Sequence, residues 1–219
     1  MASQVRLMPT ASKLSPEDFK FVSDLVREKS AIVLEIGKEY LVESRLTPVA
    51  RALEFDSIGS LVRELRTKRD SKLIEDIVDA MTTNETLFFR DRHPFETLTE
   101  EILPDLIERK AKEKTLNIWC AASSSGQEPY SVCILLKEHF PQLRDWKVNF
   151  QTTDISPLML ERTRKGIYSQ LEVNRGMPAK LMIKYFQKEG ATWQIKQELR
   201  DMLQVKPLNL ASAWGPMPR

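Results

Sequence analysis

The sequence predicts an α/β fold preceded by a smaller all-helical region. Residues 13–83 contain only segments with the apolar spacing of helices. Two later apolar runs, 116–121 and 146–153, each end in small or polar residues and lead into a helix, as consecutive βα units do. Successive βα units predict a parallel sheet with right-handed crossovers.

Composition excludes several classes of protein. The 219 residues suffice for one or two domains, and the formal net charge of +2, with both signs mixed, argues against general nucleic-acid binding. Cys120 and Cys133 lack CxxC spacing and fall in predicted buried elements, so we expect a reduced, cytoplasmic protein. With two histidines no metal site is expected, and no segment is apolar for long enough to insert into a membrane.

The N-terminal third predicts an arm followed by four helices. Residues 1–12 lack apolar periodicity and are expected to form a flexible arm. Helices are expected from the cap Ser15, over 38–55, from the cap Ser57 and from Ser71. They would form one domain over 13–83, and the α/β domain would extend over 84–219.

The third helix ends in a basic cluster. Its cations could simply complement the helix C-terminus, or they could dock on an acidic partner surface. A nucleic-acid-binding function would rest on this cluster alone and is not favoured. The cluster comprises Arg63, Arg66, Lys68, Arg69 and Lys72.

The segment after the helical region combines polar and aromatic residues. Asn84 and Thr86 precede two phenylalanines, and Arg90 follows them. Arg90 could form an ordinary salt bridge, or aromatic packing could hold it at a functional site. Residues 95–114 then predict a helix that Pro104 kinks.

The run LNIWCAASSSGQEPY, residues 116–130, predicts a buried strand, a tight turn and the start of a helix. Ligands of open α/β sheets bind at such turns, where small residues admit them and free N–H groups face them. We expect Pro129 at the first helical position. Glu128 could complement the helix dipole, or it could bind sugar hydroxyls or a cation. Neither GxGxxG nor a phosphate-loop motif is present.

Asp154 follows the second strand. It could be a turn residue before the helix that Ser156 caps, but an acid here favours a role as partner of an adenosine ribose. Residues 166–178 predict a loop, and the short runs 184–187 and 192–195 predict a hairpin. A last strand is expected over 203–208.

Several ordered motifs together resemble one family. TTNETLFFRD, WCAASSSGQEPYS, TTDIS, GIY, NRGMP, KYF and VKPLNLASAW resemble segments of CheR-type chemotaxis receptor methyltransferases, from about Leu14 onward. The resemblance implies S-adenosylmethionine as cofactor and glutamate side chains of chemoreceptors as substrates. It also implies a Rossmann-like methyltransferase domain with a small antiparallel β subdomain over about 183–202.

The resemblance implies roles for individual residues. The residues implied at the cofactor are Asn84, Thr86, Arg90, Glu128, Asp154, Asn209 and Leu210. The first two would lie over the cofactor, and Arg90 would position the substrate near the reacting centre. Glu128 would contact the methionyl end, and Asp154 the ribose hydroxyls. Asn209 and Leu210 would frame the adenine.

The resemblance also implies a receptor-facing surface on the helical domain. Arg45, Arg51, Arg63 and Arg66 would face the acidic methylation helices of a chemoreceptor. In that family the small β subdomain can also bind the C-terminal peptide of a receptor.

One departure concerns the end of the chain. Family members continue with a segment like FCRNVLIYF, which is absent here, so we expect a truncated sheet with an unpaired edge. The chain could be a fragment, could be completed by another chain, or could be a natural short form. We therefore expect weak or no methyl transfer, and self-association through the open edge. The alternative function is a catalytically weak or inactive form that binds cofactor or receptor.

Overall fold

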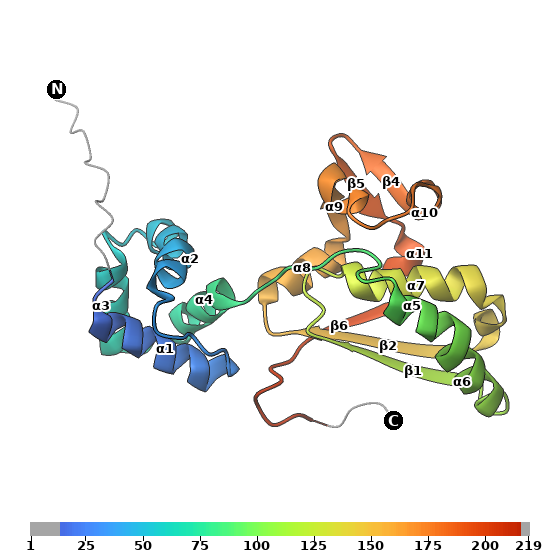
Figure 1. The fold of residues 1–219 in the computed structure, drawn as a ribbon, viewed down its shortest axis with the longest axis horizontal. Helices are drawn as coiled ribbons and strands as arrows, with labels where there is room; N and C mark the ends of the chain where they lie inside the picture. Colours follow the sequence, from blue (N-terminus) through green and yellow to red (C-terminus); the bar gives the residue numbers. More distant parts are fainter. Residues whose placement is uncertain (1–13, 216–219) are drawn as a thin grey trace. The chain divides into compact units, whose positions relative to one another are not determined.

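The computed structural model describes residues 14–215 of the chain. Between Thr83 and Asn84 the chain divides into two compact units (Figure 1). The arm expected over 1–12 lies outside the described residues. No helix within 14–215 combines the length and the apolar character that crossing a membrane requires.

The first unit consists of four helices, as the sequence predicts. They are α1 (Pro16–Ser30), α2 (Glu39–Ala52), α3 (Ile58–Lys68) and α4 (Ser71–Met81). The side chain of Ser15 accepts a hydrogen bond from the Asp18 N–H, and Ser57 forms a capping box with Ser60. Helix α4 begins at Ser71, as expected, and Asp70 is its N-cap. Apolar side chains from all four helices form one core.

The second unit is built on a three-stranded parallel sheet, which confirms the predicted fold class. Its strands β1 (Thr115–Ala121), β2 (Lys147–Asp154) and β6 (Leu203–Pro207) lie in the order β1-β2-β6. Helices α7 (Gln127–His139) and α8 (Pro157–Lys165) follow the first two strands and lie along one side of the sheet (Figure 1). Their βα turns therefore meet at the carboxyl edge of the sheet.

A small antiparallel sheet lies on the far side of α7 and α8 (Figure 1). The predicted hairpin is present as β4 (Phe186–Glu189) and β5 (Thr192–Ile195), and β3 (Ile167–Ser169) also pairs with β5. Three short helices surround this sheet, namely α9 (Gln170–Asn174), α10 (Ala179–Tyr185) and α11 (Gln197–Arg200).

The prediction of a loop over 166–178 is wrong, because this stretch contains β3 and α9. Strand β3 has only three residues and depends on pairing with β5, which lies more than twenty residues away in the chain. Ser169 and Glu172 form a capping box that starts α9. The small sheet therefore begins earlier than the expected range of 183–202.

The helix expected over 95–114 is interrupted. It comprises α5 (His93–Thr97), a π-helical turn (Leu98–Ile102) and α6 (Leu103–Arg109). Pro104 has no N–H to donate, and the N–H of Leu103 reaches back five residues to the Leu98 carbonyl. The sequence thus predicted an irregularity near Pro104, but not that it would be a π-helical turn.

The outer edge of β1 has no strand beside it within residues 14–215. Trp119 of this strand is partly exposed and packs edge-to-face against Trp214, with ring centroids 5.2 Å apart. The open edge agrees with the sequence expectation, whereas self-association through it stays a prediction.

Substitution of Gly176 tests the packing of the segment between α9 and α10 against the segment before α5. It has φ +98, and a Cβ there would lie 1.9 Å from the Phe88 carbonyl oxygen. We expect Gly176→Ala to lower the free energy of unfolding by about 3 kcal/mol or more, because backbone must move. Gly190→Ala is the matched control, since its φ is +60 and its Cβ would meet nothing within 4 Å. The control substitution should lower the free energy of unfolding by about 1 kcal/mol. Urea titration measures both variants. Equal losses would contradict the packing described here.

Candidate functional site

Asp154 joins the two βα turns at the carboxyl edge of the parallel sheet. Its Oδ2 accepts a hydrogen bond from the Ser124 N–H at 2.7 Å, and its Oδ1 accepts one from the Ser156 N–H at 2.9 Å. The side chain is the last of β2 rather than the first beyond it, and the residue is only 6% exposed. A buried carboxylate thus fixes the relative position of both turns.

The turn between β1 and α7 has an unusual backbone. Ala122, Ser124 and Gly126 have φ values of 53°, 50° and 94°, in the left-handed region that favours glycine. Gly126 is the N-cap of α7, so Pro129 is the third helical residue and not the first. A Pro at the third position still lies in the first turn, where no N–H is needed for the helix.

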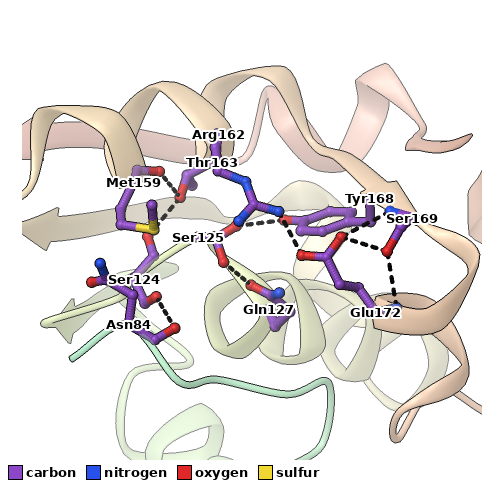
Figure 2. Close-up of polar contacts among 10 residues, drawn as sticks. All are labelled: Asn84, Ser124, Ser125, Gln127, Met159, Arg162, Thr163, Tyr168, Ser169 and Glu172. Atoms are coloured by element: carbon purple, nitrogen blue, oxygen red, sulfur yellow. Dashed lines mark hydrogen bonds and ion pairs between the residues drawn. The ribbon is translucent and has the colours of Figure 1, made fainter. Parts of the chain in front are cut away.

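Side chains beneath the turn hold this backbone in place (Figure 2). The Thr163 hydroxyl donates to the Ser124 carbonyl at 3.1 Å, and the Tyr168 hydroxyl donates to the Ser125 carbonyl at 2.7 Å. Burial raises the pKa of Tyr168 well above its usual value, so its hydroxyl remains a donor. The Ser125 hydroxyl donates to the Gln127 side-chain oxygen at 2.8 Å (Figure 2). Residues of three elements, α7, α8 and β3, therefore share the support of one turn.

The segment before α5 is attached to the same turn. The Ser124 hydroxyl donates to the Asn84 carbonyl at 3.0 Å (Figure 2). Arg90 is exposed, and its guanidinium donates to the Glu85 carbonyl at 3.1 Å. Asn84 and Asp154 thus both bind Ser124, whereas Arg90 is tied to the segment and not to the turn itself. Thr86 lies two residues beyond Asn84 and is partly buried.

Glu128 lies in the first turn of α7, where its charge complements the helix dipole. Its exposed carboxylate accepts a hydrogen bond from the Cys120 thiol, with Sγ and Oε1 3.0 Å apart. Burial first, and then the Glu128 charge, raise the pKa of the Cys120 thiol, which keeps its proton at neutral pH. A neutral donor therefore holds the Glu128 carboxylate.

Asn209 and Leu210 follow β6 at the same edge of the sheet. The Leu208 N–H donates to the Asp154 carbonyl at 3.0 Å, which continues the ladder by one residue. Asn209 then turns the chain by accepting from the Ala211 N–H at 2.9 Å, and Leu210 is exposed. Both residues therefore lie in the segment that leaves the sheet directly after the contact of Leu208 with Asp154.

The four arginines expected at a receptor surface have different surroundings within the helical unit. Arg45 donates to the carbonyls of Met81 and Thr82 at the end of α4, and so it supports the fold. Arg66 pairs with Asp18 at 3.0 Å. Arg51 and Arg63 are exposed. A receptor-facing role stays a prediction for all four.

Sequence analysis missed several residues that build the site. Cys120 was assigned only to a buried strand, and the serines only to a turn that admits a ligand. Thr163 and Tyr168 lie 39 and 43 residues from their partners, so no local pattern indicated them. The continuous run of small residues at 122–126 is the signal in the sequence that indicates an unusual turn.

The donors and acceptors at this edge suit a ligand with hydroxyl groups and a positive charge. Asp154 offers a buried carboxylate, and Glu128 an exposed one. Within the described part of the chain, the buried hydroxyl of Ser123 has no hydrogen-bond partner. An unpartnered buried hydroxyl at a turn fits a polar ligand better than an apolar one.

Comparisons with known proteins identify the family. Residues 84–219 match the family model of the CheR methyltransferase SAM binding domain, and residues 17–82 match that of the CheR methyltransferase all-alpha domain. The chain belongs to the CheR methyltransferase family. S-adenosylmethionine is therefore its cofactor, and the polar groups around Asp154 and Glu128 fit its hydroxyls and its cationic groups.

Curated CheR relatives agree with this assignment. A chemotaxis protein methyltransferase of Vibrio parahaemolyticus is 36% identical over 212 residues, which are 95% of this chain and 76% of the relative. Chemotaxis protein methyltransferase 1 of Pseudomonas aeruginosa is 38% identical over 203 residues, or 90% of this chain and 73% of the relative. This CheR chain is thus an S-adenosylmethionine-dependent methyltransferase of chemotaxis.

Tyr168→Phe tests whether the support beneath the turn serves the cofactor site. It removes the hydroxyl bonded to the Ser125 carbonyl and should cost about 1–2 kcal/mol of stability. We expect it also to weaken binding of S-adenosylhomocysteine in calorimetry. Tyr130→Phe is the control, because that buried hydroxyl bonds to the Thr163 carbonyl and not to the turn. A variant Tyr168→Phe with unchanged affinity would show that the turn keeps its shape without this bond.

Proposed function

We propose that this chain transfers the methyl group of S-adenosylmethionine to glutamate side chains of chemoreceptors in the cytoplasm. The observation that carries the proposal is the pair of carboxylates at the ends of β1 and β2. Asp154 ends β2, and Glu128 bonds to Cys120 of β1. Both charges act on the Cys120 thiol, so the two acids flank the same strand end.

Each acid has capacity left for the cofactor. A carboxylate oxygen has two lone pairs, so each Asp154 oxygen can accept one ribose hydroxyl besides its backbone N–H. Glu128 is exposed and would accept from the amino group at the methionyl end. Asn209 and Leu210 would frame the adenine beside Asp154, and Asn84 with Thr86 would cover the cofactor from the other side.

The proposed reaction needs no general base. When bound, the cofactor supplies an electrophilic methyl group on a sulfonium, and a glutamate is already ionised at neutral pH. The residues of this chain must then orient the substrate carboxylate in line with the methyl group. Arg90 is the proposed positioning cation. Very tight binding by Arg90 would weaken the nucleophile, and its exposed, tethered position suits a looser contact.

The helical unit is the proposed contact for the receptor. Arg51 and Arg63 are exposed cations that would face acidic methylation helices, whereas Arg45 and Arg66 would contribute through the shape of the unit. The alternative function, cofactor or receptor binding with little turnover, is favoured by the open edge of β1. Both functions use the same cofactor site, so only turnover separates them.

Transfer of labelled methyl groups from S-adenosylmethionine to receptor membranes tests the proposal. Asp154→Ala should abolish both S-adenosylhomocysteine binding and transfer. Arg90→Ala should lower transfer roughly tenfold or more while changing S-adenosylhomocysteine affinity much less, because the lost contact is a charge-assisted one to substrate. Arg92→Ala is the control, since that neighbouring arginine pairs with Glu96 on the surface.

Two outcomes would contradict these assignments. Binding that survives Asp154→Ala would remove the ribose role, and equal activity of the Arg90 and Arg92 variants would remove the positioning role. Cofactor binding by the wild-type chain with no methyl transfer would favour the alternative function.

Self-association is a further proposal, which rests on the lack of a neighbouring strand at the outer edge of β1 within residues 14–215. Light scattering over a concentration series should show a mean mass that rises above that of one chain. A monodisperse monomer at all concentrations would refute it.

A further inference from the structure

Cys120 is one of two buried cysteines in the second unit, and it has a polar contact that packing does not require. Its side chain is buried beneath α7, and the residue is 6% exposed. Thr152 is its register partner on β2, so both side chains point to the same face of the sheet. Thr152 is fully buried, and its hydroxyl interacts with the Cys120 thiol. A buried pair of polar groups thus lies close to Glu128 in the first turn of α7.

Glu128 reaches the Cys120 thiol from α7 with one of its two oxygens. The contact of Oε1 with the Cys120 thiol restricts the rotation of an otherwise exposed side chain. An exposed glutamate normally samples several rotamers, and ordering it costs entropy. Because this hydrogen bond forms before the ligand binds, the entropic cost of ordering Glu128 does not reduce the affinity for the ligand.

We propose that Cys120 is a positioning residue for the cofactor, whose thiol orients Glu128 toward the amino group of the methionyl end. The inference deepens the proposed function and rests on its assignment of Glu128. Oε1 is held by the thiol, and Oε2 is left to accept from the cationic amino group.

A thiol suits this role because it is a neutral donor. A lysine or arginine beside Glu128 would orient the carboxylate equally well, but it would compete with the cationic group of the ligand. The thiol leaves the negative charge of Glu128 in place. Burial and the nearby carboxylate keep the thiol protonated, so the direction of the bond does not reverse near neutral pH.

The test compares two ligands on the same protein. S-adenosylhomocysteine carries the amino acid moiety, whereas 5′-methylthioadenosine shares the adenosine and the thioether but lacks it. We expect Cys120→Ala to weaken S-adenosylhomocysteine binding roughly three- to tenfold and to leave 5′-methylthioadenosine binding nearly unchanged. Cys120→Ser retains a donor and should recover most of the loss. Both affinities are measured by calorimetry on one preparation, so a lower folded fraction affects both titrations alike.

Cys133→Ala is the matched control. Cys133 is fully buried in α7 within the same unit, and its loss should lower stability without changing the ratio of the two affinities.

Glu128→Gln distinguishes the inference from the proposed function. The relevant ratio is the affinity for S-adenosylhomocysteine divided by that for 5′-methylthioadenosine. If Glu128→Gln lowers this ratio and Cys120→Ala does not, the role of Cys120 is overturned while that of Glu128 stands. If neither variant changes the ratio, both assignments are overturned. An equal loss for both ligands in Cys120→Ala would assign the cysteine to packing alone.

Discussion

The site depends on the two hydrogen bonds that the Asp154 carboxylate accepts from the backbone of neighbouring turns. A buried carboxylate without a cation is costly unless N–H groups replace its hydration. Here Ser124 and Ser156 supply them at 2.7 and 2.9 Å. The same side chain therefore sets the spacing of the two turns and keeps a negative charge at the edge of the sheet.

The β1–α7 turn shows how a fixed shape is obtained without a glycine-rich sequence. Left-handed φ values at Ala122 and Ser124 are unfavourable for residues with a Cβ, by roughly 1–2 kcal/mol each. Hydrogen bonds from Thr163 and Tyr168 to the turn carbonyls offset this cost. Serine side chains also bind Asn84 and Gln127, which glycine could not do. The result is a preorganised turn, and a reaction that relies on positioning benefits from one.

The sequence predicted those features that local patterns determine. Ser15 and Ser57 cap their helices, the two βα units pair in parallel, and the hairpin is present. Features that depend on distant residues were not predicted. Strand β3 exists only because β5 lies beside it, and the loop-like composition of 166–178 concealed it. Similarly, Asp154 was placed at the correct strand end, but its bonds to both turns depend on how the sheet is assembled.

Charge links the geometry of the site to the proposed reaction. Methyl transfer from a sulfonium to a carboxylate converts two charged reactants into two neutral products. Asp154 is held by amide N–H groups and Glu128 by a thiol, and neither acid forms an ion pair with a cation among residues 14–215. A site that keeps its negative charge binds a sulfonium more tightly than a thioether of the same shape. Under the proposed function, the neutral donors around these acids would therefore favour replacement of S-adenosylhomocysteine by S-adenosylmethionine after each reaction. Acids paired with cations would favour this replacement less.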